Sequence, residues 1–222
     1  MAVSVVNTAT KVATGIESTS WTHDMSAGGT LAIVVAATRQ SGDTAPDTTT
    51  CTIGGQSATK LSSASSSRQF YSIWYLQDPP AGNNTIAVNI NIPDGGAHRG
   101  AGFASYLLSG SDTSENPTLE GTYKSGAATS ASVNTAISKT GNMTIGVGIQ
   151  ENVSANISFN SGQTQVLEAS NDISVYFSSY KDGLSEGSDS HGVTSNQNAE
   201  IYMAVTEIVS KDAGGAFLLN ML

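Results

Sequence analysis

Three polar residues near the end of the chain have the types and the order of a hydrolytic triad. Ser185 lies in "GLSEG", which fits the Gly-x-Ser-x-Gly pattern of a nucleophile elbow, and Asp189 and His191 follow it. An elbow needs a strand before the turn and a helix after it, with the acid and the base supplied by distant loops. Here all three residues share one stretch rich in Ser, Gly and Asp, and no helical pattern follows. We therefore predict a solvated loop, no catalytic residue and a protein that is not an enzyme.

The side chains that could hold a metal ion are scattered along the chain: His23, Cys51, His98 and His191. A zinc site usually has ligand pairs a few residues apart, and this spacing is absent. Calcium could bind loop carboxylates near Asp43 and Asp47 or near Glu186 and Asp189, but the regular ligand ladder of a calcium loop is missing. The glycine stretches lack the Gly-Lys-Ser/Thr ending of a phosphate loop. We predict no metal and no cofactor, and calcium binding by a loop stays open.

Composition excludes two classes of partner. The 222 residues carry a net charge of −9 and no basic run, so a surface that follows nucleic-acid phosphates is not expected. No stretch approaches 18 apolar residues, and "MAVSVVNTATKVATG" lacks the charged and apolar regions of a secretory signal. Cys51 is the only cysteine, so no intrachain disulfide forms. We expect a chain made in a host cytoplasm without a signal peptide, with no membrane or nucleic-acid partner.

Short β-rich runs bounded by Gly, Pro, Asn, Asp and Ser recur about every ten residues, which is typical of an all-β protein. We predict a two-sheet antiparallel β-sandwich, jelly-roll-like, with little helix. The expected strands are 3–12, 20–25, 31–38, 50–53, 58–62, 70–77, 85–92, 102–108, 131–137, 143–150, 156–159, 164–168, 173–180, 200–210 and 217–222. The turns "IGGQS" and "PPAGNN" break neighbouring strands.

The two halves of the sequence show a weak internal repeat. The matching pairs, in chain order, are "TLAIVV" with "NMTIGV", "GQSATKL" with "GQTQVL", "YSIWY" with "ISVYF", and "FASYLLS" with "MAVTEIV". The spacing within a pair shrinks along the chain, as loop deletions would produce. We predict one domain built from two pseudo-repeats, about 1–110 and 111–222, with Leu31–Val35 equivalent to Met143–Val147. Chance similarity among strands and two small β domains are the alternatives.

The stretch "QFYSIWYLQ" is apolar on both faces of its expected strand. Alternation places Tyr71, Ile73 and Tyr75 on a core face, matched in the second repeat by 173, 175 and 177. The opposite face is either covered or part of a contact surface. The end of the chain, "AGGAFLLNML", is either a final strand or a segment that docks into a neighbouring subunit. The candidate contact residues for assembly or ligand binding are Phe70, Trp74, Leu76, Tyr176, Phe217, Leu218, Leu219 and Leu222.

The stretch "TCTIGGQSATKLSSASSSRQFYSIWYLQDPPAGNNTIAVNI", followed by "GFASYLLSGSDTSENP" and a late "YMAVTEIVS", resembles a β-sandwich (jelly-roll-like) family. This family is common in bacteriophage virion structural proteins and bacterial surface proteins. The shared features are a glycine-pair hairpin, a Trp-Tyr-Leu strand, a Pro-Ala-Gly turn and an alternating Thr/Val strand, and the resemblance extends from about Thr30 to Ser210. It implies one sandwich and no catalytic motif.

The expected function follows from this resemblance and from the excluded classes. It is a non-enzymatic virion structural protein, either a capsid decoration (cement) protein or a tail component, that assembles through apolar sheet faces and termini. Its partners would be other capsid or tail proteins and its own copies, for example in a trimer. The alternative is a carbohydrate-binding or adhesion β-sandwich module with a glycan as its partner, for which Trp74 and Tyr176 would supply exposed aromatic rings.

Overall fold

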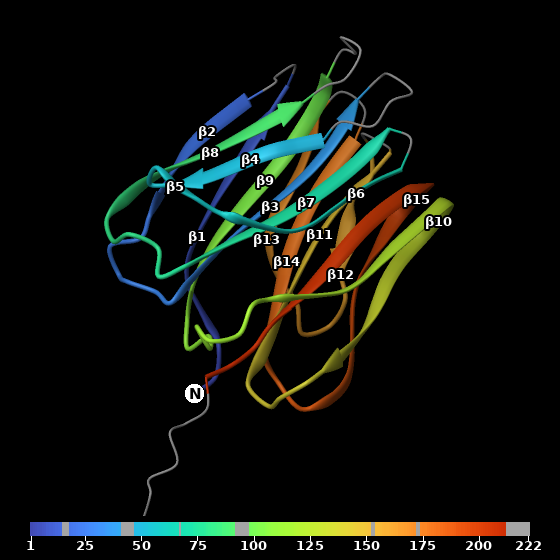
Figure 1. The fold of residues 1–222 in the computed structure, drawn as a ribbon. Helices are drawn as coiled ribbons and strands as arrows, with labels where there is room; N and C mark the ends of the chain where they lie inside the picture. Colours follow the sequence, from blue (N-terminus) through green and yellow to red (C-terminus); the bar gives the residue numbers. More distant parts are fainter. Residues whose placement is uncertain are drawn as a thin grey trace, which may run out of the picture.

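The computed structural model describes residues 1–14, 18–40, 47–66, 68–91, 98–151, 154–171 and 174–211, with the backbone alone at 40, 47–49, 66, 91, 98 and 99. Within these residues every regular element is a β-strand and no helix is present (Figure 1), which confirms the predicted all-β class. Every strand pairing is antiparallel: the sequence favours this arrangement because short turns separate most of its apolar runs.

The strands of the N-terminal half are β1 (Ser4–Ala13), β2 (Ser18–Asp24), β3 (Leu31–Gln40), β4 (Asp47–Ile53), β5 (Gln56–Ser57), β6 (Thr59–Ser66), β7 (Gln69–Gln77), β8 (Asn83–Asn91) and β9 (His98–Ser109). Those of the C-terminal half are β10 (Thr118–Ile137), β11 (Asn142–Gln150), β12 (Ile157–Phe159), β13 (Thr164–Asn171), β14 (Ser174–Leu184) and β15 (Gly187–Ile208). The expected strand 217–222 lies outside the described residues.

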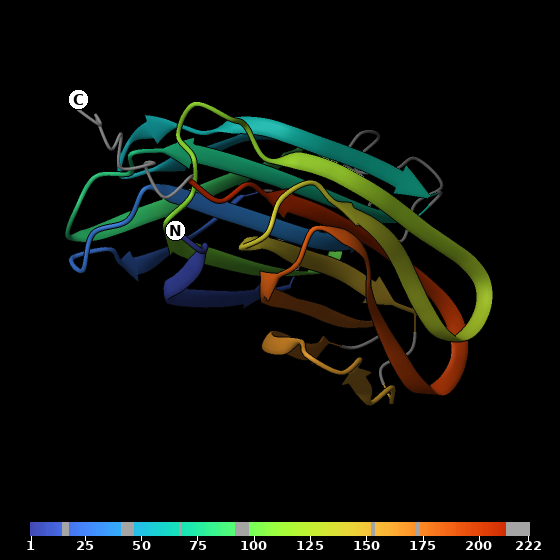
Figure 2. The ribbon, with the colours of Figure 1, turned by 90° about the horizontal axis from the view of Figure 1, so that it is seen from below.

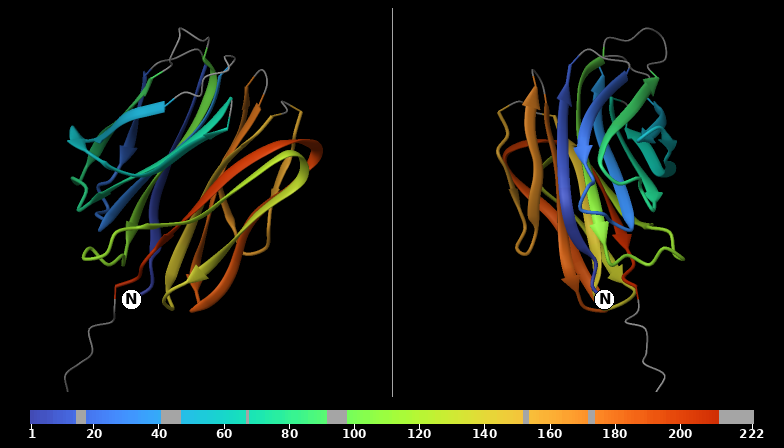
Figure 3. Two further views of the ribbon diagram at one scale, coloured as in Figure 1. Left: turned by 45° about the vertical axis from the view of Figure 1, so that its right-hand side comes forward. Right: turned by 90° about the vertical axis from the view of Figure 1, so that its left-hand side faces the viewer.

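The described strands form three sheets, where the sequence predicted two. The central sheet has the order β1-β9-β3-β7-β6, and the outer sheet β2-β8-β4-β5 packs on one of its faces. The C-terminal sheet has the order β10-β15-β11-β14-β13, with β12 paired to β15. Figure 3 shows these sheets as successive layers. A third sheet was not expected because runs such as "LAIVV" in β3 are apolar on both faces, and only the structure shows that both faces are covered by other sheets.

Three apolar clusters fill the spaces between these layers. The N-terminal core, between the outer and central sheets, is built around Trp21, Trp74 and Phe103. The interface core, between the central and C-terminal sheets, joins the two halves of the chain. The C-terminal core lies on the other face of the C-terminal sheet and includes Phe177 and Met203. The large side chains of all three clusters are buried, so most of the apolar burial that stabilises the chain is shared among them.

The C-terminal core is closed by β10 and β15, which bend back over their own sheet. These strands are 20 and 22 residues long, and two of the register shifts in their pairing lie close together at the bend, between Ser125 and Ala128 and between Ala128 and Ser130. Beyond this corner, Val193 of β15 packs in the same cluster as Met203 of the same strand. Figure 2 shows the curved β10–β15 hairpin. Such irregular pairing bends a strand and lets one sheet supply two layers.

The two halves share the same order of strands. β3 and β11, which contain the runs 31–35 and 143–147 that were expected to be equivalent, are the middle strands of their sheets. The pairs β6–β7 and β13–β14 also shift register at the same place. Thr59 lies opposite Tyr75 and Thr164 opposite Tyr180, and in each pair the shift begins one residue later along β6 or β13.

The prediction that 173, 175 and 177 of the second half face the same core as Tyr71, Ile73 and Tyr75 is wrong. Tyr71, Ile73 and Tyr75 face the interface core, but Val175 and Phe177 face the C-terminal core. The strand pairing makes Tyr180 the counterpart of Tyr75, which differs from the sequence match by three residues. An odd displacement moves every side chain of a strand to its other face.

The prediction of a loop around "GLSEG" is also wrong. β14 continues to Leu184 and β15 begins at Gly187, so the stretch is two strands joined by a tight turn. The inward-facing residues of this part of β15 include Asp189 and His191 rather than apolar side chains. The strand therefore lacks the apolar alternation by which strands are recognised.

Candidate functional site

The structure buries three of the predicted contact residues. Phe70 and Trp74 are 3% and 1% exposed and Tyr176 is fully buried, while Leu76 is half-buried against the N-terminal core. These residues therefore form no exposed aromatic surface. Other sheets cover both faces of β7, while β14 lies between the central sheet and the bent β10 and β15 of its own sheet. The other four candidates, Phe217, Leu218, Leu219 and Leu222, lie outside the described residues.

Tyr176 instead helps to join the two halves. It lies across β9 at Gly100 and Gly102, and a Cβ at Gly102 would approach the Tyr176 Cβ to 2.4 Å. Its hydroxyl donates a hydrogen bond to Asn171 Oδ1 at 3.1 Å. The two glycines thus let the ring pack directly against the backbone of the central sheet.

The triad residues are not brought together. Ser185 is exposed in the β14–β15 turn, whereas the buried His191 lies between Thr144 Oγ1 at 3.1 Å and Ser179 Oγ at 2.9 Å. Asp189 pairs with Lys181 Nζ at 2.8 Å. Burial lowers the pKa of His191 to about 3, and the nearby Lys181 charge adds to this effect. His191 is therefore a neutral interior side chain held by two hydroxyl groups, for which Gly146 leaves room.

The residues considered as metal ligands are also separate. Among the described residues, no group of three or more His, Cys, Asp or Glu side chains is arranged to hold a metal ion. The side chains of Asp43 and Asp47 lie outside the described part, and Cys51 is buried in the N-terminal core. Burial raises the pKa of the Cys51 thiol to about 12, so it stays protonated.

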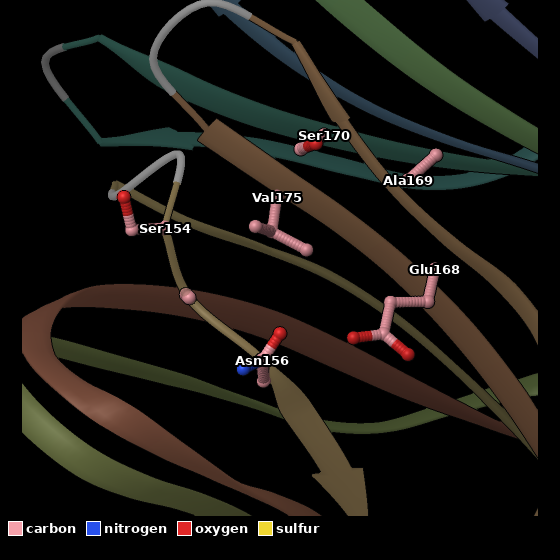
Figure 4. Close-up of a pocket in the computed structure, with 7 residues that line it drawn as sticks. Ser154, Asn156, Glu168, Ala169, Ser170 and Val175 are labelled. Atoms are coloured by element: carbon pink, nitrogen blue, oxygen red, sulfur yellow. The ribbon is translucent and has the colours of Figure 1, made fainter.

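A hollow of about 260 Å³ lies where β12 faces β13 and β14. It is lined by Ser154, Ala155, Asn156, Glu168, Ala169, Ser170 and Val175. Figure 4 shows the Glu168 carboxylate and the Asn156 side chain on either side of the open space, with Val175 above both of them in this view. This lining is more polar than that of most small-ligand sites, which are mainly apolar with a few polar groups, so the hollow suits a polar ligand.

The hollow exists because two neighbouring strands do not pair. In the N-terminal half, β5 continues the outer sheet by pairing with β4, and Ile53 lies opposite Gln56. No described residue of β12 pairs with β13, and instead Glu168 Oε1 accepts a hydrogen bond from the Ile157 N–H at 2.9 Å. One carboxylate oxygen thus satisfies a backbone donor at the strand edge and holds the side chain beside the open space.

No motif or spacing in the sequence indicates this site. Its polar members are one carboxylate, one amide and two hydroxyls in runs that look like ordinary strand ends and turns. Its apolar members are two alanines and one valine, which are common in any strand. Only the layering of β12 over β14 brings Asn156, Glu168 and Val175 together.

The two ends of the described chain meet at one pole of the molecule. The Met1 ammonium donates to the Lys211 carbonyl at 2.6 Å, and the Val3 N–H donates to the Gly141 carbonyl at 2.9 Å. Below them, Asn142 Nδ2 donates to the buried Glu207 carboxylate at 2.6 Å. The N-terminal strand is thus fastened to the C-terminal half, beside the point where residues 212–222 continue (Figure 1).

No family model matches this chain, and no significant match is found among curated proteins or solved structures. The described part of the chain has no helix with the length and apolar character needed to cross a bilayer.

Proposed function

We propose that this chain is a non-enzymatic virion structural protein, a capsid decoration (cement) or tail component that assembles with other virion proteins and with its own copies. The observation that carries the proposal is the interface core, through which the two halves pack into one block. Each half covers an apolar face of the other. A block of this kind resists deformation without a bound ligand. The sequence resemblance to phage virion β-sandwiches supports the same function.

We further propose that the block is two jelly-roll-like sandwiches that arose by internal duplication. The shared strand order and the register shift at the same place in β6–β7 and β13–β14 support this. The second layers also correspond. In the N-terminal half β8 lies between β2 and β4, and in the C-terminal half the outer part of β15 lies between the outer part of β10 and β12. Chance similarity would not be expected to repeat both layers and an irregularity.

Specific contacts hold the two halves in one orientation. Tyr71 and Tyr202 meet edge to face with ring centroids 5.4 Å apart. The buried Arg39 guanidinium pairs with Glu151 and donates to Ser174 Oγ at 3.2 Å, which links β3 to the C-terminal half. Directional contacts within an apolar interface favour one packing over others. A fixed arrangement is what a structural subunit requires to transmit force.

The proposed assembly contact is the end of the chain rather than a sheet face. The large apolar side chains that are exposed among the described residues are Met1, Val12 and Leu119, which are too few to form a contact face. The sequence Phe217–Leu222 contains five large apolar residues and follows Lys211 at the pole where both ends meet. We assign association with neighbouring subunits to this segment.

Sedimentation velocity of the purified full-length chain over a range of concentrations tests the proposal. The expected result is reversible or stable association into a defined oligomer, with no small-molecule ligand required. A chain that stays monomeric at every concentration, and that also fails to bind particles of the virus that encodes it, would contradict a structural function.

A further inference from the structure

We propose that the hollow between β12 and β13 binds one neutral sugar ring through adjacent hydroxyl groups. This inference goes beyond the structural function and does not depend on it, because the residues that line the hollow are not part of the proposed terminal contact. It also differs from the aromatic platform considered for a carbohydrate-binding module, since Trp74 and Tyr176 are buried.

The size of the hollow favours a single ring. Its volume of about 260 Å³ falls just below the range of roughly 300–1,000 Å³ that is typical of sites for drug-sized ligands. It opens between two strand edges, so a longer chain of sugars could extend outward from a ring held inside. A peptide strand that paired with β12 would have to displace Glu168 from the Ile157 N–H.

The polar groups match the hydrogen-bonding pattern of a sugar. One Glu168 oxygen accepts from Ile157, which fixes the carboxylate, and the group retains acceptor capacity for ligand hydroxyls. The Asn156 side chain, which has no hydrogen bond to another described residue, offers one acceptor and two donors. Ser154 and Ser170 add hydroxyl groups on the same rim. A ring with two neighbouring hydroxyls can donate to the carboxylate and exchange hydrogen bonds with the amide.

The apolar lining residues and the negative charge of the hollow limit the class of ligand further. Val175, Ala155 and Ala169 offer a small apolar surface to the C–H groups of a sugar ring. Among the lining residues that the structure describes, Glu168 is the one charged side chain, and the chain carries a net charge of −9, so an anionic ligand would be repelled. A single carboxylate is a poor calcium site, because calcium takes six to eight oxygen ligands. A neutral polyhydroxylated ring is the class that meets all of these conditions.

The affinity should be low, because no aromatic ring lines the hollow. We expect a dissociation constant of about 1 mM or weaker. The test is an NMR titration of the ¹⁵N-labelled full-length chain with the methyl glycosides of glucose, galactose, mannose and N-acetylglucosamine. At least one sugar should shift the amide signals of 155–157 and 168–170 in a saturable way, and leave those of the central sheet unchanged.

Two variants make the assignment specific. Glu168→Gln retains an oxygen that can accept from Ile157 but loses the charge, and Asn156→Ala removes the amide. Each should weaken sugar binding about tenfold or more, because a hydrogen bond to a charged or buried group is lost. Glu186→Gln, an exposed carboxylate in the β14–β15 turn, is the matched control and should bind as the parent does. Unchanged melting temperatures would show that the variants are folded.

The proposal would be overturned if none of the four sugars shifted these signals. It would also be overturned if sugar binding shifted the same signals equally in both variants. The same holds if calcium or methylammonium shifted these signals and the sugars did not. Failure of the terminal segment to mediate assembly would leave this result unaffected, so the two proposals can fail separately.

Discussion

The N-terminal and C-terminal halves have the same strand order but differ at their corners and free edges. In the N-terminal half, β1 and β2 are separate strands, whereas β10 runs through the equivalent corner as one bent strand. The N-terminal half extends its outer layer with β5, while the C-terminal half leaves β12 unpaired on that side and has the hollow there. The shared part is the face that each half presents to the other, and the variable part is the edge that faces solvent.

The interiors of the halves differ as well. The N-terminal core contains two tryptophans, with Trp21 and Phe103 rings 5.4 Å apart. Buried polar groups form connected hydrogen bonds in both halves. Ser105 contacts Trp21 and His23 in the N-terminal half, and His191 contacts Thr144 and Ser179 in the C-terminal half. The two interiors thus differ in their aromatic side chains, and both bury polar groups that are held by hydrogen bonds.

The largest expected effect tests whether the halves unfold together. Ile33 and Ile145 are fully buried in the interface core, on the middle strands of their sheets. Ile33→Ala and Ile145→Ala should each lower the free energy of unfolding by about 2–5 kcal/mol, because each leaves a cavity in the shared core. Urea unfolding should remain one transition in both variants. Two separate transitions, each sensitive to only one substitution, would show that the halves are independent.

The polar interior of the C-terminal half predicts sensitivity to acid. The pKa of His191 is about 3 in the folded chain against 6.5 ordinarily, so between these values the unfolded chain binds a proton that the native chain does not. Stability is therefore fully present above about pH 6.5 and falls as the pH drops, with a limiting slope near 1.4 kcal/mol per pH unit for one proton. The pKa of His23 is also lowered by burial and adds in the same direction.

Urea unfolding between about pH 7 and pH 4 measures this slope. His191→Gln should reduce it more than His23→Gln does, because His191 is more deeply buried and has the larger shift. Equal slopes in the parent and in His191→Gln would contradict a neutral buried histidine.

A smaller effect is expected for one hydrogen bond across the interface core. Ser178 Oγ donates to the Gly146 carbonyl at 2.7 Å, so the Tyr106 hydroxyl donates to Ser178. Tyr106→Phe should cost about 1 kcal/mol, since Ser178 keeps its other partner. Tyr180→Phe, whose ring packs edge to face with Tyr106, is the control and should cost less. An equal or larger loss in the control, which also removes only a hydroxyl group, would contradict the assignment of this cost to the Tyr106–Ser178 hydrogen bond.

The smallest effect is expected at the exposed turn. Ser185→Ala should change the free energy of unfolding by no more than about 0.5 kcal/mol, because the side chain is exposed and His191 faces the interior. It should also leave every activity unchanged. Hydrolysis of an activated ester by the parent, abolished by this substitution, would refute the prediction that the protein is not an enzyme.

Much of the fold could be predicted because its strands are short apolar runs between strong turn signals. β7 and β8 are separated by "PPAGNN", and their bounds agree closely with the expected ones. The outer part of β10 was expected as the strand 131–137. The outer part of β15 escaped prediction because inward positions such as His191 are polar and are satisfied by hydroxyl groups on other strands. Sequence alternation detects apolar burial, and it does not detect a buried polar network.

The site was less predictable than the fold. Trp74 was a reasonable contact candidate, because an aromatic strand with two apolar faces looks the same whether it is covered or exposed. The hollow arises from a missing strand pair between β12 and β13, and its lining residues have no shared motif. A site produced by the relative position of two layers becomes visible only once the layers are placed.

Removal of residues 216–222 tests the proposed assembly most directly, when a melting curve and sedimentation are measured on the same truncated chain. The account predicts that association is lost while the melting temperature stays nearly unchanged, because the described part already closes its three cores without this segment. A truncated chain that unfolds first, through the loss of core side chains at about 2–5 kcal/mol each, would contradict it. So would a truncated chain that still associates as the parent does.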